Sequence, residues 1–121
     1  RLYMASFFVV DDSKVARHFI KKMLTELGHE VVCETDDGID VLKLYSKHKP
    51  DFVTIDLEMP TIDGITVANT LMKADKNSKM IMITSIIDKK KTMQALSSGI
   101  HNVLQKPITA EQLNQAINSF I

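Results

Sequence analysis

The sequence predicts a doubly wound α/β fold with five parallel strands in the order 2-1-3-4-5 and five helices divided between the two faces of the sheet. The first observation behind this prediction is an alternation along the whole chain between short β-favouring runs and longer segments with helical apolar spacing. The second is that the runs FFVV and MIMI are apolar throughout, as expected for strands covered on both faces. The connections are short, and parallel neighbours need right-handed crossovers, which place the helices on both faces.

Five short runs are expected to form the strands. Each is rich in β-branched, aromatic or other apolar residues and precedes a segment with helical periodicity. They are Phe7–Val10, Glu30–Cys33, Phe52–Ile55, Met80–Ile83 and Val103–Leu104.

The first helix is expected to begin after Ser13, whose side chain can cap it, and to end at Gly28. An amphipathic helix packs one apolar stripe against the sheet. The stripe expected here recurs every four residues and consists of Val15, Phe19, Met23 and Leu27.

The remaining helices are placed by turn and capping residues. The last helix begins with a capping box formed by Thr109 and Gln112, and its apolar face consists of Leu113, Ala116, Ile117 and Phe120. For the middle three, the expected signals are Asp37 or Gly38 opening the second, Asp63-Gly64 the third and Asp88 the fourth, with Gly99 closing the fourth.

The composition narrows the class of protein. The 121 residues suit one domain, so residues 1–121 are expected to form one domain, although position 1 is not Met and the chain could be trimmed or excised from a longer protein. Lys plus Arg and Asp plus Glu each number 15, which argues against a nucleic-acid or membrane partner. The single cysteine, Cys33, excludes an internal disulfide, and no apolar run approaches the roughly 20 residues that span a bilayer. These features predict a cytoplasmic protein.

Charged or hydroxyl side chains follow all five strands, and those after the second, Asp36 and Asp37, are assigned to capping the next helix. The carboxyl ends of parallel strands meet at one edge of the sheet, and ligands bind there where the strand order reverses. In the order 2-1-3-4-5 the first and third strands flank that reversal, so Asp11, Asp12 and Asp56 are expected to meet in one crevice. Thr84, with Ser85 beside it, follows the fourth strand, and Lys106 follows the fifth.

This set of side chains favours phosphoryl transfer to a carboxylate. Three neighbouring carboxylates raise the pKa of at least one of them unless a cation is bound. Oxygen ligands alone favour Mg²⁺, for which Mn²⁺ could substitute. Lys106 and Thr84 would bind the other oxygens of a phosphoryl group, and Asp56, alone at the end of a central strand, is the expected nucleophile.

Four motifs occur in the order and spacing of a known family. They are VVDDS (Val9–Ser13), IDLEMPTIDG (Ile55–Gly64), ITS (Ile83–Ser85) and QKP (Gln105–Pro107). With them the whole chain resembles the receiver domain of bacterial two-component response regulators, most closely the single-domain, chemotaxis-type regulators. This resemblance also implies the flavodoxin-like form of the doubly wound fold.

The resemblance implies how the acidic residues act. Asp56 would accept a phosphoryl group from a phosphohistidine on a sensor histidine kinase or phosphotransfer protein, and the protein would catalyse the slow hydrolysis of its own aspartyl phosphate. Asp12, Asp56 and the backbone carbonyl of Glu58 would bind Mg²⁺ directly, and Asp11 would act largely through water. No other cofactor is implied.

The resemblance also implies a switch. Thr84 would move toward the phosphoryl group, Lys106 would pair with it, and the Lys106-Pro107 bond would be cis. Partner binding would then change at the face formed by the fourth helix, fifth strand and fifth helix. The partner would be a downstream protein or a missing effector domain.

The chain departs from the family pattern at a few positions. Val103 stands where the family usually has an aromatic residue, and Gly99-Ile100 stands where it commonly has Gly-Ala. Glu58 and Ile86 occupy positions that tune the access of water to the acyl phosphate; the Glu58 side chain is expected to line the site without binding metal.

Two other functions remain as hypotheses. A pseudo-receiver, which Val103 favours, would bind its partner equally with and without a beryllofluoride-type phosphoryl mimic. An aspartyl-phosphate phosphohydrolase would normally need a second aspartate where Glu58 stands. The run Lys89–Lys91 is interpreted as a solvated helix face, and the four histidines, which lack ligand spacing, are expected at the surface or an edge.

Overall fold

The computed structural model describes residues 3–120 and has the predicted parallel sheet, with strands in the order β2-β1-β3-β4-β5. All five predicted strands are confirmed, and no strand end differs from its predicted position by more than two residues. The strands are β1 (Ser6–Val10), β2 (Glu30–Thr35), β3 (Phe52–Ile55), β4 (Met80–Thr84) and β5 (Asn102–Gln105).

Four of the five helices begin where their capping residues predict, whereas the Asp37 or Gly38 signal opens a short 3-10 turn and the second helix itself begins at Val41. Ser13, Asp63, Asp88 and Thr109 each accept a hydrogen bond from the backbone N–H three residues on, and Asp37 caps a short 3-10 turn, η1 (Gly38–Asp40). The helices are α1 (Lys14–Glu26), α2 (Val41–His48), α3 (Gly64–Ala74), α4 (Lys89–Ser97) and α5 (Ala110–Asn118).

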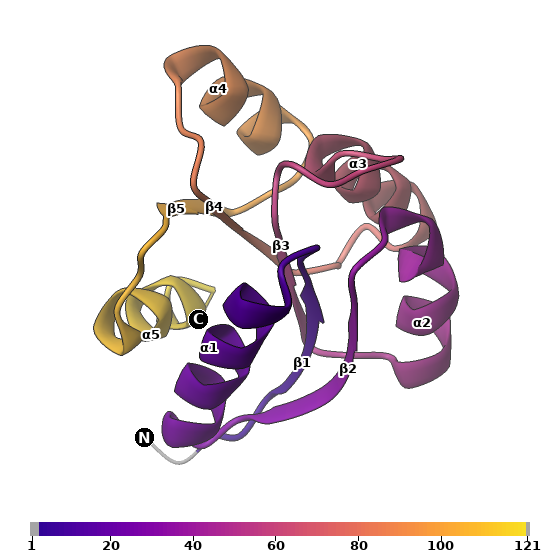
Figure 1. Ribbon diagram of the computed structural model, residues 1–121. Coiled ribbons are helices and arrows are strands. Elements are labelled where there is room, and N and C mark those ends of the chain that lie inside the picture. The colour runs from indigo at the N-terminus through magenta and orange to yellow at the C-terminus, as the bar shows by residue number, and fades with distance from the viewer. Residues whose placement is uncertain (1–2, 121) are drawn as a thin grey trace.

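The sheet separates two hydrophobic cores. In Figure 1, α1 and α5 lie together on one side of the sheet, and α2 and α3 lie on the other. Successive residues of β1 point into opposite cores, with Phe7 and Val9 toward α1 and α5, and Phe8 and Val10 toward α2, α3 and α4. The central strands are therefore buried on both faces, and their carboxyl ends are held rigidly.

The predicted buried face of α1 is confirmed in its second half, where Met23 and Leu27 pack partly buried against the core, and is wrong in its first half. Val15 and Phe19 are 65% and 52% exposed, whereas Ile20 and Leu24 are buried. Two rows of residues spaced by four lie side by side on this helix, and both contain large apolar side chains. Packing against β1 and α5 selects the row that includes Ile20 and Leu24, because that row faces the core.

One histidine also differs from its expected place. His29 is buried, its Nδ1 accepts a hydrogen bond from the Ala5 N–H at 3.0 Å, and its ring packs against Phe7 with centroids 5.2 Å apart. It therefore joins the start of β1 to the α1–β2 connection.

Within residues 3–120, none of the helices combines the length and hydropathy that a bilayer-spanning segment needs.

Thr54→Val is expected to raise the free energy of unfolding by about 1 kcal/mol. The Thr54 side chain is buried in β3, and its hydroxyl has no hydrogen-bond partner within the described residues. Valine keeps the shape and removes the desolvated polar atom. Urea denaturation measures the change. Thr54→Ser is the matched control, because it keeps the hydroxyl, loses a methyl group and should lower stability; a loss of stability in Thr54→Val would contradict the argument.

Candidate functional site

Three carboxylates meet at the carboxyl edge of the sheet. Asp11 and Asp12 follow β1, and Asp56 follows β3, and one carboxylate oxygen from each lies within 4.8 Å of the others. Pairing of Val10 with Ile55 brings the two strands to the same level, and the Asp56 N–H donates to the Val10 carbonyl at 3.0 Å. The expected crevice at the reversal of strand order is therefore present.

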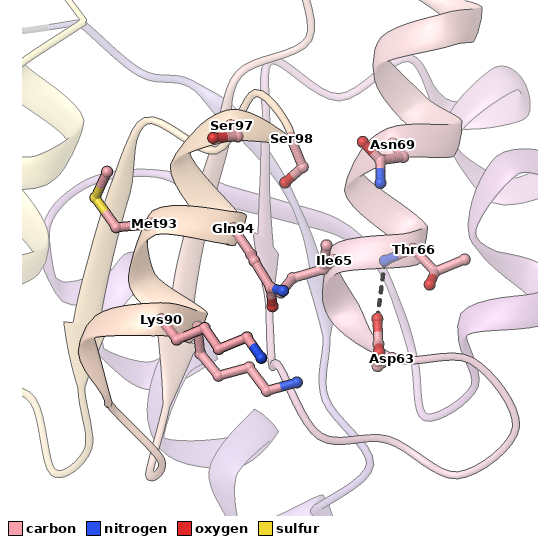
Figure 2. A pocket seen from close by; sticks show the side chains of 10 residues that line it. Asp63, Ile65, Thr66, Asn69, Lys90, Met93, Gln94, Ser97 and Ser98 are labelled. Atoms are coloured by element: carbon pink, nitrogen blue, oxygen red, sulfur yellow. Dashed lines mark hydrogen bonds between the residues drawn. The ribbon is translucent and has the colours of Figure 1, made fainter.

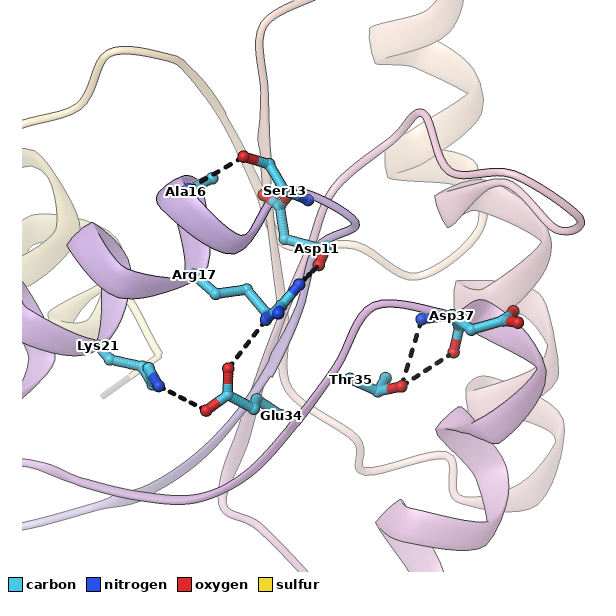
Figure 3. A network of polar contacts seen from close by, with 8 residues as sticks. All are labelled: Asp11, Ser13, Ala16, Arg17, Lys21, Glu34, Thr35 and Asp37. Atoms are coloured by element: carbon cyan, nitrogen blue, oxygen red, sulfur yellow. Dashed lines mark hydrogen bonds and ion pairs between the residues drawn. The ribbon is translucent and has the colours of Figure 1, made fainter.

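Asp11 is the most constrained of the three. Its residue is 1% exposed, and each of its four polar atoms has a partner within the described part of the chain. Two partners hold the backbone and two hold the carboxylate, as Figure 3 shows in part. The N–H donates to the Thr35 carbonyl (3.1 Å), the carbonyl accepts from Arg17 Nη1 (2.7 Å), Oδ1 accepts from the Ser13 N–H (2.9 Å) and Oδ2 accepts from Lys106 Nζ (2.7 Å).

Lys106 bridges the two buried carboxylates. Its ammonium lies 2.7 Å from Asp11 Oδ2 and 3.7 Å from Asp56 Oδ1. The lysine is held at the end of β5 by a hydrogen bond from its N–H to the Thr84 carbonyl at 2.8 Å. The Lys106-Pro107 bond is cis, as the family resemblance implies. The sequence placed this lysine near the acids, but its close pairing with Asp11 is a feature that only the structure provides.

Burial is the main electrostatic influence on Asp56. It raises the pKa of this carboxyl from its ordinary value of 3.8 to about 6; the negative charge of Asp11 acts in the same direction, and Lys106 opposes both. The sequence predicted a raised pKa from repulsion between the acids alone. The structure adds the larger cause, which is that the strand end carrying Asp56 lies inside the protein.

The two hydroxyls at the end of β4, on Thr84 and Ser85, have different surroundings. Thr84 is 1% exposed, and its hydroxyl oxygen accepts a hydrogen bond from the Ile86 N–H at 3.2 Å. Ser85 is exposed and lines a separate apolar cavity between α1 and the β5–α5 loop. Thr84 is therefore the buried one of these two hydroxyls, and its oxygen accepts a hydrogen bond from the loop that leads into α4.

A cavity of about 410 Å³ opens beside the acids. Glu58 and Ile86, the two positions expected to control access of water, both line it, and Glu58 is exposed. Lys91, which the sequence assigned to a solvated face, also lines this cavity. The sequence showed only that Lys91 lies in the first turn of α4. Whether its side chain reaches the cavity depends on where that helix packs, which the sequence does not show.

Lys91 lines this cavity and also a neighbouring hollow between α3 and α4, which Figure 2 shows. In Figure 2 the Lys90 side chain extends toward the start of α3, where the Asp63 carboxylate caps the helix through the Thr66 N–H. The other lining residues there are mainly uncharged polar side chains, such as Asn69, Gln94 and Ser97. Of the three clustered carboxylates, Asp12 lines the cavity beside Glu58, and none lines the hollow between α3 and α4.

The loop after Asp56 depends on Gly64, which the sequence identified only as a helix start. A Cβ at position 64 would lie 2.2 Å from the Asp56 carbonyl oxygen, and the Gly64 N–H donates to the Leu57 carbonyl at 2.7 Å. In the same loop Thr61 has a φ of 71°, a conformation unfavourable for a β-branched residue. The loop is therefore tightly folded and strained beside the acidic site.

The donor set fits a hard divalent cation. All three side chains offer carboxylate oxygens, which suit Mg²⁺ or Mn²⁺ better than softer metals. Both oxygens of Asp11 already accept hydrogen bonds, whereas Asp12 is exposed. Asp12 and Asp56 are consequently better placed to bind an ion directly than Asp11 is.

The parallel sheet and the acid cluster at its carboxyl edge are those of a receiver domain, and comparison with known proteins supports this assignment. The chain belongs to the response regulator receiver domain family, which it matches over residues 7–118. It is 34% identical over 110 residues to the "Chemotaxis protein CheY" of Bacillus subtilis (strain 168), covering 91% of this chain and 92% of that protein.

Solved structures of related proteins share the fold. A chain in the crystal structure of the CheX-CheY-BeF3-Mg+2 complex from Borrelia burgdorferi superposes with a TM-score of 0.91 at 28% identity, covering 96% of this chain and 89% of that one. The response regulator domain of Thermotoga maritima CheB superposes with a TM-score of 0.87 at 28% identity, covering 97% and 96%.

Gly64→Ala is expected to lower the free energy of unfolding by about 2 kcal/mol or more, because the new Cβ would collide with the Asp56 carbonyl and displace the loop. Gly28→Ala is the matched control. Gly28 has a φ of 89°, but no atom lies within 4 Å of the position that a Cβ would occupy, so this substitution adds only backbone strain, about 1 kcal/mol. Urea denaturation compares the two; equal losses would refute the steric argument.

Asp56→Asn is expected to become more stable than the wild type as the pH rises. Because the folded pKa of Asp56 is raised from 3.8 to about 6, ionising Asp56 weakens the folded state, and the loss develops as pH rises between those values. The variant lacks this titration, so its advantage should grow over that range to about 3 kcal/mol. Denaturation in EDTA measures it. A difference that does not change with pH would contradict the raised pKa.

Proposed function

We propose that this protein is a phosphorylation-activated signalling switch in which Asp56 accepts a phosphoryl group from a histidine kinase or phosphotransfer protein. The observation that supports this most directly is the surroundings of Asp56. Its carboxylate ends a central strand, has oxygens of Asp11 and Asp12 within 4.8 Å, and has the Lys106 ammonium at 3.7 Å. We further propose that residues 1–121 act as a single receiver domain.

The proposed transfer depends on Mg²⁺, for which Mn²⁺ could substitute. Asp12, Asp56 and the Glu58 backbone carbonyl would hold the ion, and the Asp11 carboxylate would contribute through water. When bound, the ion neutralises charge on the phosphoryl oxygens and on the acids. It would also favour the ionised form of Asp56 that acts as the nucleophile, countering the effect of burial on the pKa of that carboxyl.

The chemical step needs little from the protein beyond position and charge. An Asp56 oxygen attacks phosphorus, the bond from phosphorus to the donor imidazole nitrogen breaks, and the imidazole leaves with the bonding electron pair. Lys106 can turn from its partners to a phosphoryl oxygen, because its ammonium already lies between Asp11 and Asp56. Slow attack of water on the same phosphorus would return Asp56 to its carboxylate form and release inorganic phosphate.

We propose that the output is a change in partner binding at the α4–β5–α5 face. The Thr84 hydroxyl accepts a hydrogen bond from the Ile86 N–H, so movement of Thr84 toward a phosphoryl group would pull on the loop before α4. Met93 and Leu96 on α4 are 58% and 45% exposed and offer apolar surface to a partner. Val103 packs partly buried against the core and could not swing as an aromatic residue does, so the loop is the proposed route.

The proposed recipient is a downstream protein or an effector domain. One relative of known structure was crystallised in a complex described as CheX-CheY-BeF3-Mg+2, which supports a protein partner for this chain too. Direct nucleic-acid binding is not proposed, because acidic and basic residues balance at 15 each. The pseudo-receiver alternative gains no support from the site, where the acids lie close together and Lys106 pairs with two of them.

Incubation with acetyl phosphate and Mg²⁺ is expected to add one phosphoryl group to the protein, measured by intact mass. Asp56→Asn should gain none, because the nucleophile is absent, and EDTA should suppress the reaction in the wild type. Asp36→Asn, which changes an exposed aspartate outside the acid cluster, is the control and should react like the wild type. A wild type that gains no phosphoryl group, or an unchanged adduct in Asp56→Asn, would refute the proposal.

A further inference from the structure

A network of three charged side chains supports the loop that carries Asp11 and Asp12. Arg17 lies in the first half of α1, and its side chain is only 14% exposed. As Figure 3 shows, its Nη1 donates to the Asp11 carbonyl at 2.7 Å, and its Nε donates to Glu34 Oε1 at 2.8 Å. The other oxygen of Glu34 accepts from Lys21 Nζ at 2.5 Å. The network therefore ties α1 and the end of β2 to the β1–α1 loop.

The hydrogen bond from Arg17 holds the peptide unit between Asp11 and Asp12. The Asp11 carbonyl and the Asp12 N–H belong to one planar group, so a donor that fixes the carbonyl also fixes the direction in which the chain enters Asp12. Asp12 is exposed, and within residues 3–120 no hydrogen bond or ion pair holds its carboxylate. The position of that carboxylate therefore depends on its backbone.

Glu34 makes the arginine rigid. Burial disfavours the Glu34 carboxylate, but hydrogen bonds and positive charge from Lys21 and Arg17 outweigh it and hold the pKa of Glu34 below its ordinary value. Glu34 therefore carries a negative charge at neutral pH and binds the Arg17 Nε, leaving Nη1 directed at the carbonyl. A lysine at position 17 could not make both contacts in this forked geometry.

We propose that Arg17 is a positioning residue for the metal site: with Glu34, it fixes the Asp11-Asp12 peptide and so holds the Asp12 carboxylate ready to bind Mg²⁺ with Asp56. This inference rests on the proposed function, since it assumes that the acid cluster binds Mg²⁺. It adds a residue that lies outside the acid, hydroxyl and lysine set. Arg17 touches neither the ion nor the phosphoryl group in this scheme and acts through the backbone of the loop.

The test is the Mg²⁺ dissociation constant of the folded protein, measured by isothermal titration calorimetry. Arg17→Met should raise it about 10-fold, the scale on which partners of metal ligands usually act. Glu34→Gln should raise it less, and Arg17→Lys should restore part of the affinity. Lys21→Met is the matched control, because Lys21 contacts Glu34 but not the loop, and should change the constant less than about 2-fold.

A kinetic measurement separates positioning from a structural role. In acetyl phosphate reactions, Arg17→Met should need about 10-fold more Mg²⁺ for half-maximal rate and reach nearly the wild-type rate at saturating Mg²⁺. If Arg17→Met only melts at lower temperature and binds Mg²⁺ as the wild type does, the inference is overturned while the proposed function stands. If Glu34→Gln, the milder variant, leaves the constant unchanged, the role of Glu34 is overturned. A wild type that binds no Mg²⁺ would overturn both proposals.

Discussion

The site depends on one interaction, the pairing of Lys106 with Asp11 at the carboxyl edge of the sheet. Two buried carboxylates from neighbouring strands would repel each other strongly, and a single ammonium 2.7 Å from Asp11 and 3.7 Å from Asp56 offsets that repulsion. The lysine arrives from β5, at the far edge of the sheet, so the whole strand order is needed to bring it there. Without this cation, burial of Asp11 at 1% exposure would be highly unfavourable.

The division of tasks among the three acids follows from how tightly each is held. Asp11 has every polar atom satisfied and serves as an anchor for the loop, the lysine and Arg17. Asp56 is buried but only loosely paired, so the pKa of its carboxyl is raised to about 6 and it responds readily to an added positive charge. Asp12 is exposed, and it is the acid that the proposed metal site would add to Asp56. A single type of side chain thus takes three roles set by environment.

The site also concentrates local strain. Thr61 adopts a left-handed backbone conformation, and Gly64 leaves no space for a side chain next to the Asp56 carbonyl. Thr54, directly before this region in β3, carries a buried hydroxyl without a partner in the described structure. Such features cost stability and are tolerated where two well-packed cores hold the surrounding strands. The packing of the sheet therefore stabilises the strained loop that follows Asp56.

The sequence alone determined the features that depend on short-range signals. Alternating periodicity predicted the element order, and capping residues placed the starts of four helices to within a residue, all except α2. The strand order then brought Asp11, Asp12, Asp56, Thr84 and Lys106 to one edge. Only the tertiary structure decided which row of α1 is buried, that the His29 side chain is buried, and that Arg17 donates a hydrogen bond to the Asp11 carbonyl. Caps and periodicity are encoded within a few residues of chain. The pairing of Lys106 with Asp11 joins residues 95 positions apart, and its geometry exists only once both cores have packed.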